Sequence, residues 1–324
     1  KLELVRRNPH YFLPMLDGRS LLIGTDHESM KEQFLAMFSM QDWRANAALA
    51  EEIAMIRDDL APSWLAEPLS VQATAERYIR PSLQEVFVKL VTGTVEHYLA
   101  RFEFQSEMLI AMYAVTDGFS GLAGSFGTPG TGMNFLVHNM CRLPGSEGTW
   151  MVAKGGMGAI ANAFAQTARA HGAEILTSSG VQRIVTTNGI ATGVVLSDGR
   201  ELTARAVIVN ADPFRLREMV GRAALPAPLN ARIDNFKRTG TTMKINMALS
   251  DLPRFKCLPE MRGQHNGTMH LLPQGPHPIA EIKAGFDAAM KAFQSGQTDV
   301  SGAKTARDAL YADIADATTQ TATR

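Results

Sequence analysis

The stretch that decides the fold covers residues 150–213 and reads WMVAKGGMGAIANAFAQTARAHGAEILTSSGVQRIVTTNGIATGVVLSDGRELTARAVIVNADP. It opens with an apolar run at 150–153, and a glycine cluster at 155–158 follows. The alanine-rich segment after the glycines predicts a helix over 159–171. Gly172 comes directly after it and is the residue type that favours a left-handed helix cap.

Two turn signals, Asn188-Gly189 and Asp198-Gly199, separate three runs of alternating apolar residues. Such pairs suit tight hairpins, because both central residues can take a positive φ. We therefore expect a short strand at 174–177, a meander whose strands each bury one face, as at 202–208, and a final apolar strand at 206–209. Pro213 cannot donate to a strand ladder, so the chain should turn away there.

Four motifs occur here in order: KGGMGA at 154–159, HGAEI at 171–175, ATGVVLSDG at 191–199 and VNADP at 209–213. Together they closely resemble the phytoene desaturase-like FAD-dependent oxidoreductases, which act on carotenoids and retinoids. The resemblance runs more loosely from the first residues to about Phe293. It implies an α/β protein with an incomplete FAD/NAD(P)-binding Rossmann-like flavoprotein fold and a substrate domain built from a mixed sheet and helices.

The resemblance also implies a division of the chain. Residues 1–149 should form the first part of the substrate domain, 150–215 a re-entrant part of the FAD-binding domain, 216–295 the second part of the substrate domain, and 296–324 a poorly ordered tail. The Gly-x-Gly-x-x-Gly phosphate loop that opens the family's polypeptide is not found, nor is its C-terminal flavin segment. We therefore expect the chain to be the middle of a longer flavoprotein.

The resemblance places six residues at the FAD cofactor: Gly155, Gly156, Met157, Val181, Asn210 and Ala211. A glycine loop at a helix start exposes N–H groups to an anionic ligand at the positive end of the helix dipole. By the resemblance, the glycine pair lies near the flavin, Val181 meets the adenine through its backbone, and the turn at 210–211 passes the cofactor. Without the resemblance, a tight strand-to-helix connection would explain the same glycines.

The flanking segments predict a hairpin and a helical layer. The runs at 3–7 and 19–24 are strand-like and are joined across Asp17-Gly18. Residues 42–126 have helical spacing in several pieces, and Ser82 should cap one of them. This layer is interpreted as a core packed on a sheet; the alternative is that some faces line a cavity for a long apolar substrate. The 17 methionines fit both interpretations.

Beyond Pro213, the pattern predicts a short helix at 214–219 and a turn at the prolines of 226–228. A strand at 241–249, a turn and strand at 266–271, and an amphipathic helix at 279–293 follow. The glycine-rich segment 118–132 should be a loop, and it either borders an active-site mouth or only connects elements.

Composition excludes several classes of protein. The 32 basic and 32 acidic residues cancel, which gives no case for nucleic-acid binding. Cys141 and Cys257 are far apart, so no dithiol or zinc site is expected, and a reducing, cytoplasmic location fits. His138 lies three residues from Cys141, but no further ligand clusters with them, so we expect a core histidine and no metal site. Contact with a membrane surface through an apolar patch stays open.

No catalytic triad, metal motif or carboxylate pair can be recognised from spacing, so no catalytic residue is assigned. That silence fits a flavin enzyme, in which the cofactor carries the chemistry. The resemblance implies an FAD-dependent dehydrogenase or desaturase that takes a hydride from an apolar, polyene or lipid-like small molecule. The alternatives are an amine-oxidase-like flavoenzyme, a non-catalytic interaction or regulatory protein that keeps the fold, and a lipid-binding module. The sequence indicates no oligomeric state.

Overall fold

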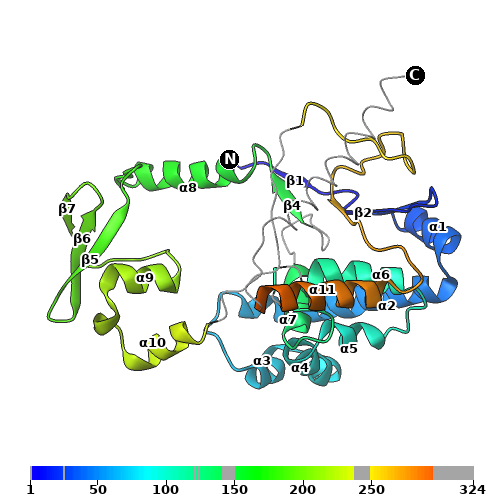
Figure 1. The fold of residues 1–324 in the computed structure, drawn as a ribbon, viewed down its shortest axis with the longest axis horizontal. Coiled ribbons are helices and arrows are strands. Elements are labelled where there is room, and N and C mark those ends of the chain that lie inside the picture. The colour runs from blue at the N-terminus through cyan, green and yellow to red at the C-terminus, as the bar shows by residue number, and fades with distance from the viewer. Residues whose placement is uncertain are drawn as a thin grey trace. The chain divides into compact units, whose positions relative to one another are not determined.

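The computed structural model describes residues 2–24, 26–119, 121–122, 124–140, 150–236 and 249–294 (Figure 1). The chain divides into two compact units. Unit 1 comprises residues 1–2 and 155–239, and unit 2 comprises 3–154 and 240–324. The assignment of 1–149, 150–215, 216–295 and 296–324 to substrate-binding, FAD-binding and tail roles stays a prediction.

Unit 2 contains two small sheets in its described part. In one, β1 (Leu4–Arg6) pairs antiparallel with β4 (Met151–Ala153). In the other, β2 (Tyr11–Pro14) lies between β3 (Ser20–Ile23), to which it is antiparallel, and β8 (Thr268–Met269), to which it is parallel.

The hairpin across Asp17-Gly18 is confirmed, but its first strand is β2 and not the predicted run at 3–7. That run pairs with β4 instead. Pro9 separates the two segments, and because proline has no N–H group, a strand could not continue through it. The strand predicted at 266–271 is confirmed as β8.

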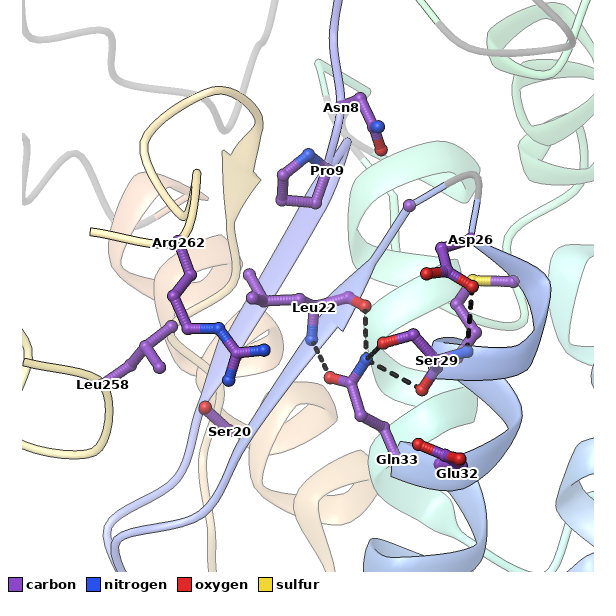
Figure 2. A pocket seen from close by; sticks show the side chains of 12 residues that line it. Asn8, Pro9, Ser20, Leu22, Asp26, Ser29, Glu32, Gln33, Leu258 and Arg262 are labelled. Carbon is purple, nitrogen blue, oxygen red and sulfur yellow. Dashed lines mark hydrogen bonds between the residues drawn. The ribbon is translucent and has the colours of Figure 1, made fainter. Parts of the chain in front are cut away.

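The edge of β3 is closed by a side chain from α1 (His27–Met37). Asp26 caps the start of this helix, because its carboxylate accepts a hydrogen bond from the Ser29 N–H at 3.0 Å. Four residues after Ser29, Gln33 accepts from the Leu22 N–H at 2.8 Å and donates to the Leu22 carbonyl at 3.2 Å (Figure 2). One amide thus satisfies both outward-facing backbone groups of an edge residue, which protects the sheet from pairing with another chain.

A helical layer forms the bulk of unit 2. Its helices are α2 (Met40–Leu60), α3 (Val71–Tyr78), α4 (Gln84–Thr92), α5 (Val95–Ala100), α6 (Glu107–Tyr113), α7 (Thr131–His138) and α11 (Pro278–Gln294). A π-helical turn (Ala114–Gly118) extends α6, and 3-10 turns occupy Ala61–Ser63 and Pro81–Leu83. The helices predicted over 42–126 and 279–293 are confirmed.

The layer and the β2–β3 hairpin share one hydrophobic core, which confirms the interpretation as a packed layer. Leu13 and Leu21 of the hairpin are fully buried together with Ile56, Leu90 and Leu109 of the helices. The cap predicted at Ser82 is wrong: Ser82 lies inside a 3-10 turn, and α4 begins one residue later than a cap there requires.

Unit 1 combines helices with an antiparallel meander. Its elements are α8 (Met157–Ala170), β5 (Val181–Thr187), β6 (Ile190–Leu196), β7 (Glu201–Thr203), α9 (Pro213–Val220), a 3-10 turn (Arg222–Ala224) and α10 (Ala227–Asp234). The turn signals are confirmed. Asn188 and Gly189 both have positive φ, 51° and 78°, whereas at the second turn the positive φ falls on Gly199 alone. The helix after Pro213 is confirmed, and the turn at 226–228 leads into α10, which the sequence analysis did not predict.

Two predicted strands of unit 1 are wrong. Residues 174–177 and 206–209 are irregular, and Ile208 is 97% exposed. An apolar run becomes a strand only when a neighbour pairs with its backbone, and β5, β6 and β7 pair only with one another among the described residues. The buried face predicted at 202–208 is also wrong, because β7 is an edge strand and these residues are exposed except Val207, which is half-buried.

The remaining predictions concern residues outside the described part. They concern Cys141, the tail at 296–324 and the strand predicted at 241–249, of which only Leu249 is described. Within the described ranges, no helix has both the length and the hydropathy needed to cross a membrane.

Candidate functional site

The predicted glycine loop has the backbone that a close-fitting ligand requires. Gly155 and Gly156 have φ of 83° and 75°, a region that residues with a Cβ atom rarely adopt. Gly156 is the N-cap of the fourteen-residue helix α8, whose first N–H groups have no partner within the helix. A Cβ atom built on Gly156 would meet nothing within 4 Å, so its backbone is open to approach, and the next residue, Met157, is exposed. The loop therefore fits a polar or anionic portion of a cofactor such as FAD.

The other predicted cofactor residues lie at the meander. Val181 opens β5, and the ladder with β6 shifts register between Val181 and Arg183. Such a bulge leaves a residue unpaired and is frequent next to binding sites. Asn210 and Ala211 are exposed in the irregular segment before Asp212, which caps α9 through the N–H groups of two following residues. The helix that follows the 210–211 turn, α9, packs against β5, the strand of Val181.

All six predicted residues lie in unit 1, where they fall into two separate groups. Gly155, Gly156 and Met157 lie at the start of α8, and the meander lies beyond its other end (Figure 1). A helix of this length spans about 21 Å at 1.5 Å per residue. A ligand that touches both groups must therefore be extended, as a dinucleotide is.

A second candidate site lies inside unit 2, and the sequence analysis missed it. Asp117, on the π-helical turn, is only 4% exposed. Its carboxylate accepts hydrogen bonds from the Tyr11 hydroxyl, at 3.3 and 3.4 Å to its two oxygens, and from the Asn139 amide at 3.3 Å. Burial raises the pKa of Asp117 to about 6 in spite of these donors. A π-helical turn that carries a buried carboxylate of raised pKa is typical of functional positions.

Two neutral histidines flank Tyr11. The rings of His10 and His270 lie edge-on to the Tyr11 ring, with centroids 5.1 and 5.0 Å away, and the His270 Nδ1 lies 2.8 Å from the Thr116 hydroxyl. Burial, and then the charge of Arg7, lowers the pKa of both histidines to about 4. In contrast, burial and the nearby Asp117 carboxylate raise the pKa of Tyr11. At neutral pH Tyr11 is therefore protonated, and both imidazoles are neutral, with one N–H each.

Arg7 anchors the cluster to the sheet. Its Nη2 donates to the His10 carbonyl at 2.7 Å and to the Thr268 hydroxyl of β8 at 2.8 Å. The buried Nε of Arg7 and Nδ1 of His10 have no hydrogen-bond partner among the described residues. The predicted core histidine, His138, contacts the Asp117 carbonyl through its Nδ1 at 2.9 Å.

No local sequence signal marks the cluster, because its members come from residues 7–11, 116–117, 138–139 and 270. The parallel pairing of β2 with β8 brings the first and last of these groups together. In the described ranges, no group of three or more metal-ligating side chains could hold a metal ion.

Residues 43–265, more than half of the chain, match the family described as flavin containing amine oxidoreductase. The chain belongs to this family. The match spans the helical layer of unit 2 except α11 and the first turn of α2, and it spans most of unit 1. Membership of the family therefore agrees with the resemblance carried by the four motifs at 154–213.

Similar individual proteins support this membership. Pyridine nucleotide-disulfide oxidoreductase domain-containing protein 2 of Rattus norvegicus is 32% identical over 303 residues, which cover 83% of this chain and 52% of the relative. Hydroxyneurosporene desaturase of Cereibacter sphaeroides is 28% identical over 202 residues, covering 62% and 39%. A 4,4'-diapophytoene desaturase of Methylomonas sp is 44% identical over 231 residues, covering 65% and 39%. The chain thus spans about half the length, or less, of these relatives, and the predicted resemblance to desaturase-like flavoproteins is confirmed.

Proposed function

We propose that the chain is part of an FAD-dependent oxidoreductase of the dehydrogenase or desaturase type. The observation that carries this proposal is the open, left-handed Gly155-Gly156 loop at the start of α8, in a chain that belongs to a flavin family. When bound, the flavin supplies the hydride acceptor. Gly155, Gly156 and Met157 would hold its polar portion, and Val181 with the turn at 210–211 would meet the far end of the cofactor.

We further propose that unit 1 belongs to an FAD-binding domain of Rossmann-like fold. The irregular segments at 174–177 and 206–209 support this, because both are apolar and partly or largely exposed. Segments of this kind become strands when a neighbouring strand supplies hydrogen bonds. The helix α8 supports it as well, since its Phe164 is 75% exposed and no residue of α8 is buried.

For the substrate, we propose an apolar, polyene or lipid-like molecule. Two of the relatives are desaturases by name, hydroxyneurosporene desaturase and 4,4'-diapophytoene desaturase. The helical layer of unit 2 carries exposed apolar side chains, such as Met133 and Val137, that such a molecule could contact. An amine substrate is the second candidate, because the matched family is described by amine oxidoreduction.

The decisive experiment is the visible absorption spectrum of the protein, purified with the gene's upstream and downstream codons included. We expect a flavin band, which polyene substrates and not simple amines should bleach in the absence of oxygen. Gly156→Val should abolish flavin retention, because valine cannot adopt the φ of 75° and would fill the open cradle. Gly221→Val is the matched control, since Gly221 has a φ of 85° and equally open surroundings outside the loop.

A folded, colourless protein that takes up no added FAD would contradict the proposal. The interaction or regulatory alternative would then replace it. Bleaching by amines alone would keep the flavin but reassign the substrate.

We also propose a cytoplasmic protein that touches a membrane surface through the segment after α2. Leu65 is fully exposed there beside Trp64, a residue type enriched at membrane interfaces. Leu65→Ser should reduce cosedimentation with phosphatidylcholine vesicles, whereas Leu16→Ser, which removes another largely exposed leucine from the β2–β3 turn, should not. Equal cosedimentation of the two variants would contradict this membrane contact.

A further inference from the structure

An apolar pocket of about 380 Å³ opens on the helical layer of unit 2, between the segment 60–71 and helices α3, α4 and α7. Its floor belongs to the hydrophobic core: Phe87, Leu136 and Met140 line it and are almost fully buried. Its walls are apolar but open, since Met133 and Val137 are each nearly half exposed. The volume is in the range of small-molecule sites, which are mostly apolar with a few polar groups.

The walls of this pocket are the part whose apolar surface a ligand would cover most. Every CH₂ group that leaves water adds favourable free energy, so an alkyl chain laid along the floor would be held there without any polar contact. The methionine side chains on the floor and wall adapt to such a chain, because a thioether has several accessible rotamers.

The polar groups that line the pocket then decide which head group the ligand carries. The Ser63 and Thr74 hydroxyls already donate to backbone carbonyls, at 2.7 and 2.9 Å. Glu67 is the one lining residue with a charged side chain, and no hydrogen bond or ion pair joins its carboxylate to another described residue. Two aromatic rings, Trp64 and Tyr78, line the same pocket. A free carboxylate with aromatic faces attracts a cation and repels an anion.

We propose that this pocket binds a single-chain amphiphile with a positively charged head, such as an alkylammonium ion. The chain lies against the core residues of the floor, and the ammonium group lies at Glu67 and the aromatic rings. Arg77 stacks outside the pocket, with its guanidinium 5.3 Å from the Tyr78 ring centroid, and it is not a lining residue. The proposal concerns binding alone and does not rest on the flavin.

The test compares decylammonium with decanoate, both below their micelle-forming concentrations, by titration calorimetry and by the emission of Trp64. We expect saturable binding at one site and an affinity for decylammonium about fivefold higher, the size expected for one exposed charge pair. Glu67→Gln should remove this preference, and Glu51→Gln, which alters an exposed carboxylate outside the pocket, should keep it. Val137→Asp should weaken decanoate binding by about tenfold, because it places a charge on the apolar wall.

Trp64→Phe separates the signal from the binding: the emission change should vanish, while the calorimetric affinity changes little. Four outcomes would overturn the proposal. These are no saturable binding, tighter binding of decanoate than of decylammonium, a preference that survives Glu67→Gln, and binding seen only with lipid vesicles, which would identify a membrane surface instead of a ligand pocket. Loss of flavin binding would leave every one of these measurements interpretable.

Discussion

Replacing Asp117 by asparagine should change how the stability of unit 2 depends on pH. Burial raises the pKa of this carboxyl from 3.8 to about 6. The folded state therefore holds the proton more tightly than the unfolded chain does. Stability contributed by the protonated form is present below about pH 4, decreases as the pH rises to about 6 and is lost above that. The shift corresponds to a cost of about 3 kcal/mol at neutral pH.

Asparagine is nearly the same shape and carries no charge, so it removes this cost. The Tyr11 hydroxyl can still donate to the side-chain oxygen of the new asparagine. The Asn139 amide, however, loses the second carboxylate oxygen as its acceptor, because an NH₂ group replaces that oxygen. Rearranging that contact costs about 1 kcal/mol. We therefore expect D117N to be about 1 kcal/mol less stable than the wild type at pH 4 and about 2 kcal/mol more stable at pH 7.

Urea unfolding at several pH values between 4 and 7.5 measures this difference, with the emission of the buried Trp43 reporting on unit 2. His10 and His270 act in the opposite direction, because their pKa values are lowered and their protonation destabilises the fold as the pH falls toward 4. Both proteins contain them, so their effect cancels in the difference. Asp287→Asn, on the exposed side of α11, controls for the removal of one carboxylate. A difference between D117N and the wild type that does not vary with pH would refute the raised pKa.

Two further predictions concern the sheets. Gln33→Ala should destabilise unit 2 by about 1–3 kcal/mol in the same urea assay, because both Leu22 backbone groups lose their partner; Gln72→Ala, which removes only an exposed contact within α3, should cost about 0.3 kcal/mol, and equal costs would contradict the edge-closing role. Gly193→Ala should destabilise the β6–β7 pairing by about 1–3 kcal/mol, since a Cβ there would collide with the Leu202 carbonyl. Faster amide hydrogen exchange in β6 measures the second effect, and unchanged protection would contradict it.

The sequence predicted what local chemistry determines. The Asn188-Gly189 turn and the end of α8 near Gly172 each depend on a few adjacent residues, and the structure confirms both. Strand pairing does not depend on adjacent residues alone. A run such as 206–209 has the composition of a strand whether or not a neighbouring strand is present to form hydrogen bonds with it. The glycine loop could be found because its positive φ angles demand glycine, which leaves a visible signature.

The cluster around Asp117 could not be predicted in this way. The pKa of Asp117 is raised because packing buries the carboxyl, and the groups that surround it come from distant parts of the chain. The sequence also does not distinguish a π-helical turn from the ordinary end of a helix. The pocket beside Glu67 is similar: its methionines suggested apolar surface, but only the fold shows that the Glu67 carboxylate lies with them.

The parallel pairing of β2 with β8 has a consequence for synthesis of the protein. About 250 residues separate the two strands, including all the described helices of the chain except α11. At ribosomal rates of about 5–20 residues per second, β2 waits roughly 13–50 s for its partner. During that interval unit 1 and most of the helical layer can already fold, while Arg7 and Tyr11 lack the contacts that Thr268 and His270 provide. A nascent chain stalled before residue 268 should therefore expose the free edge of β2 to chaperones.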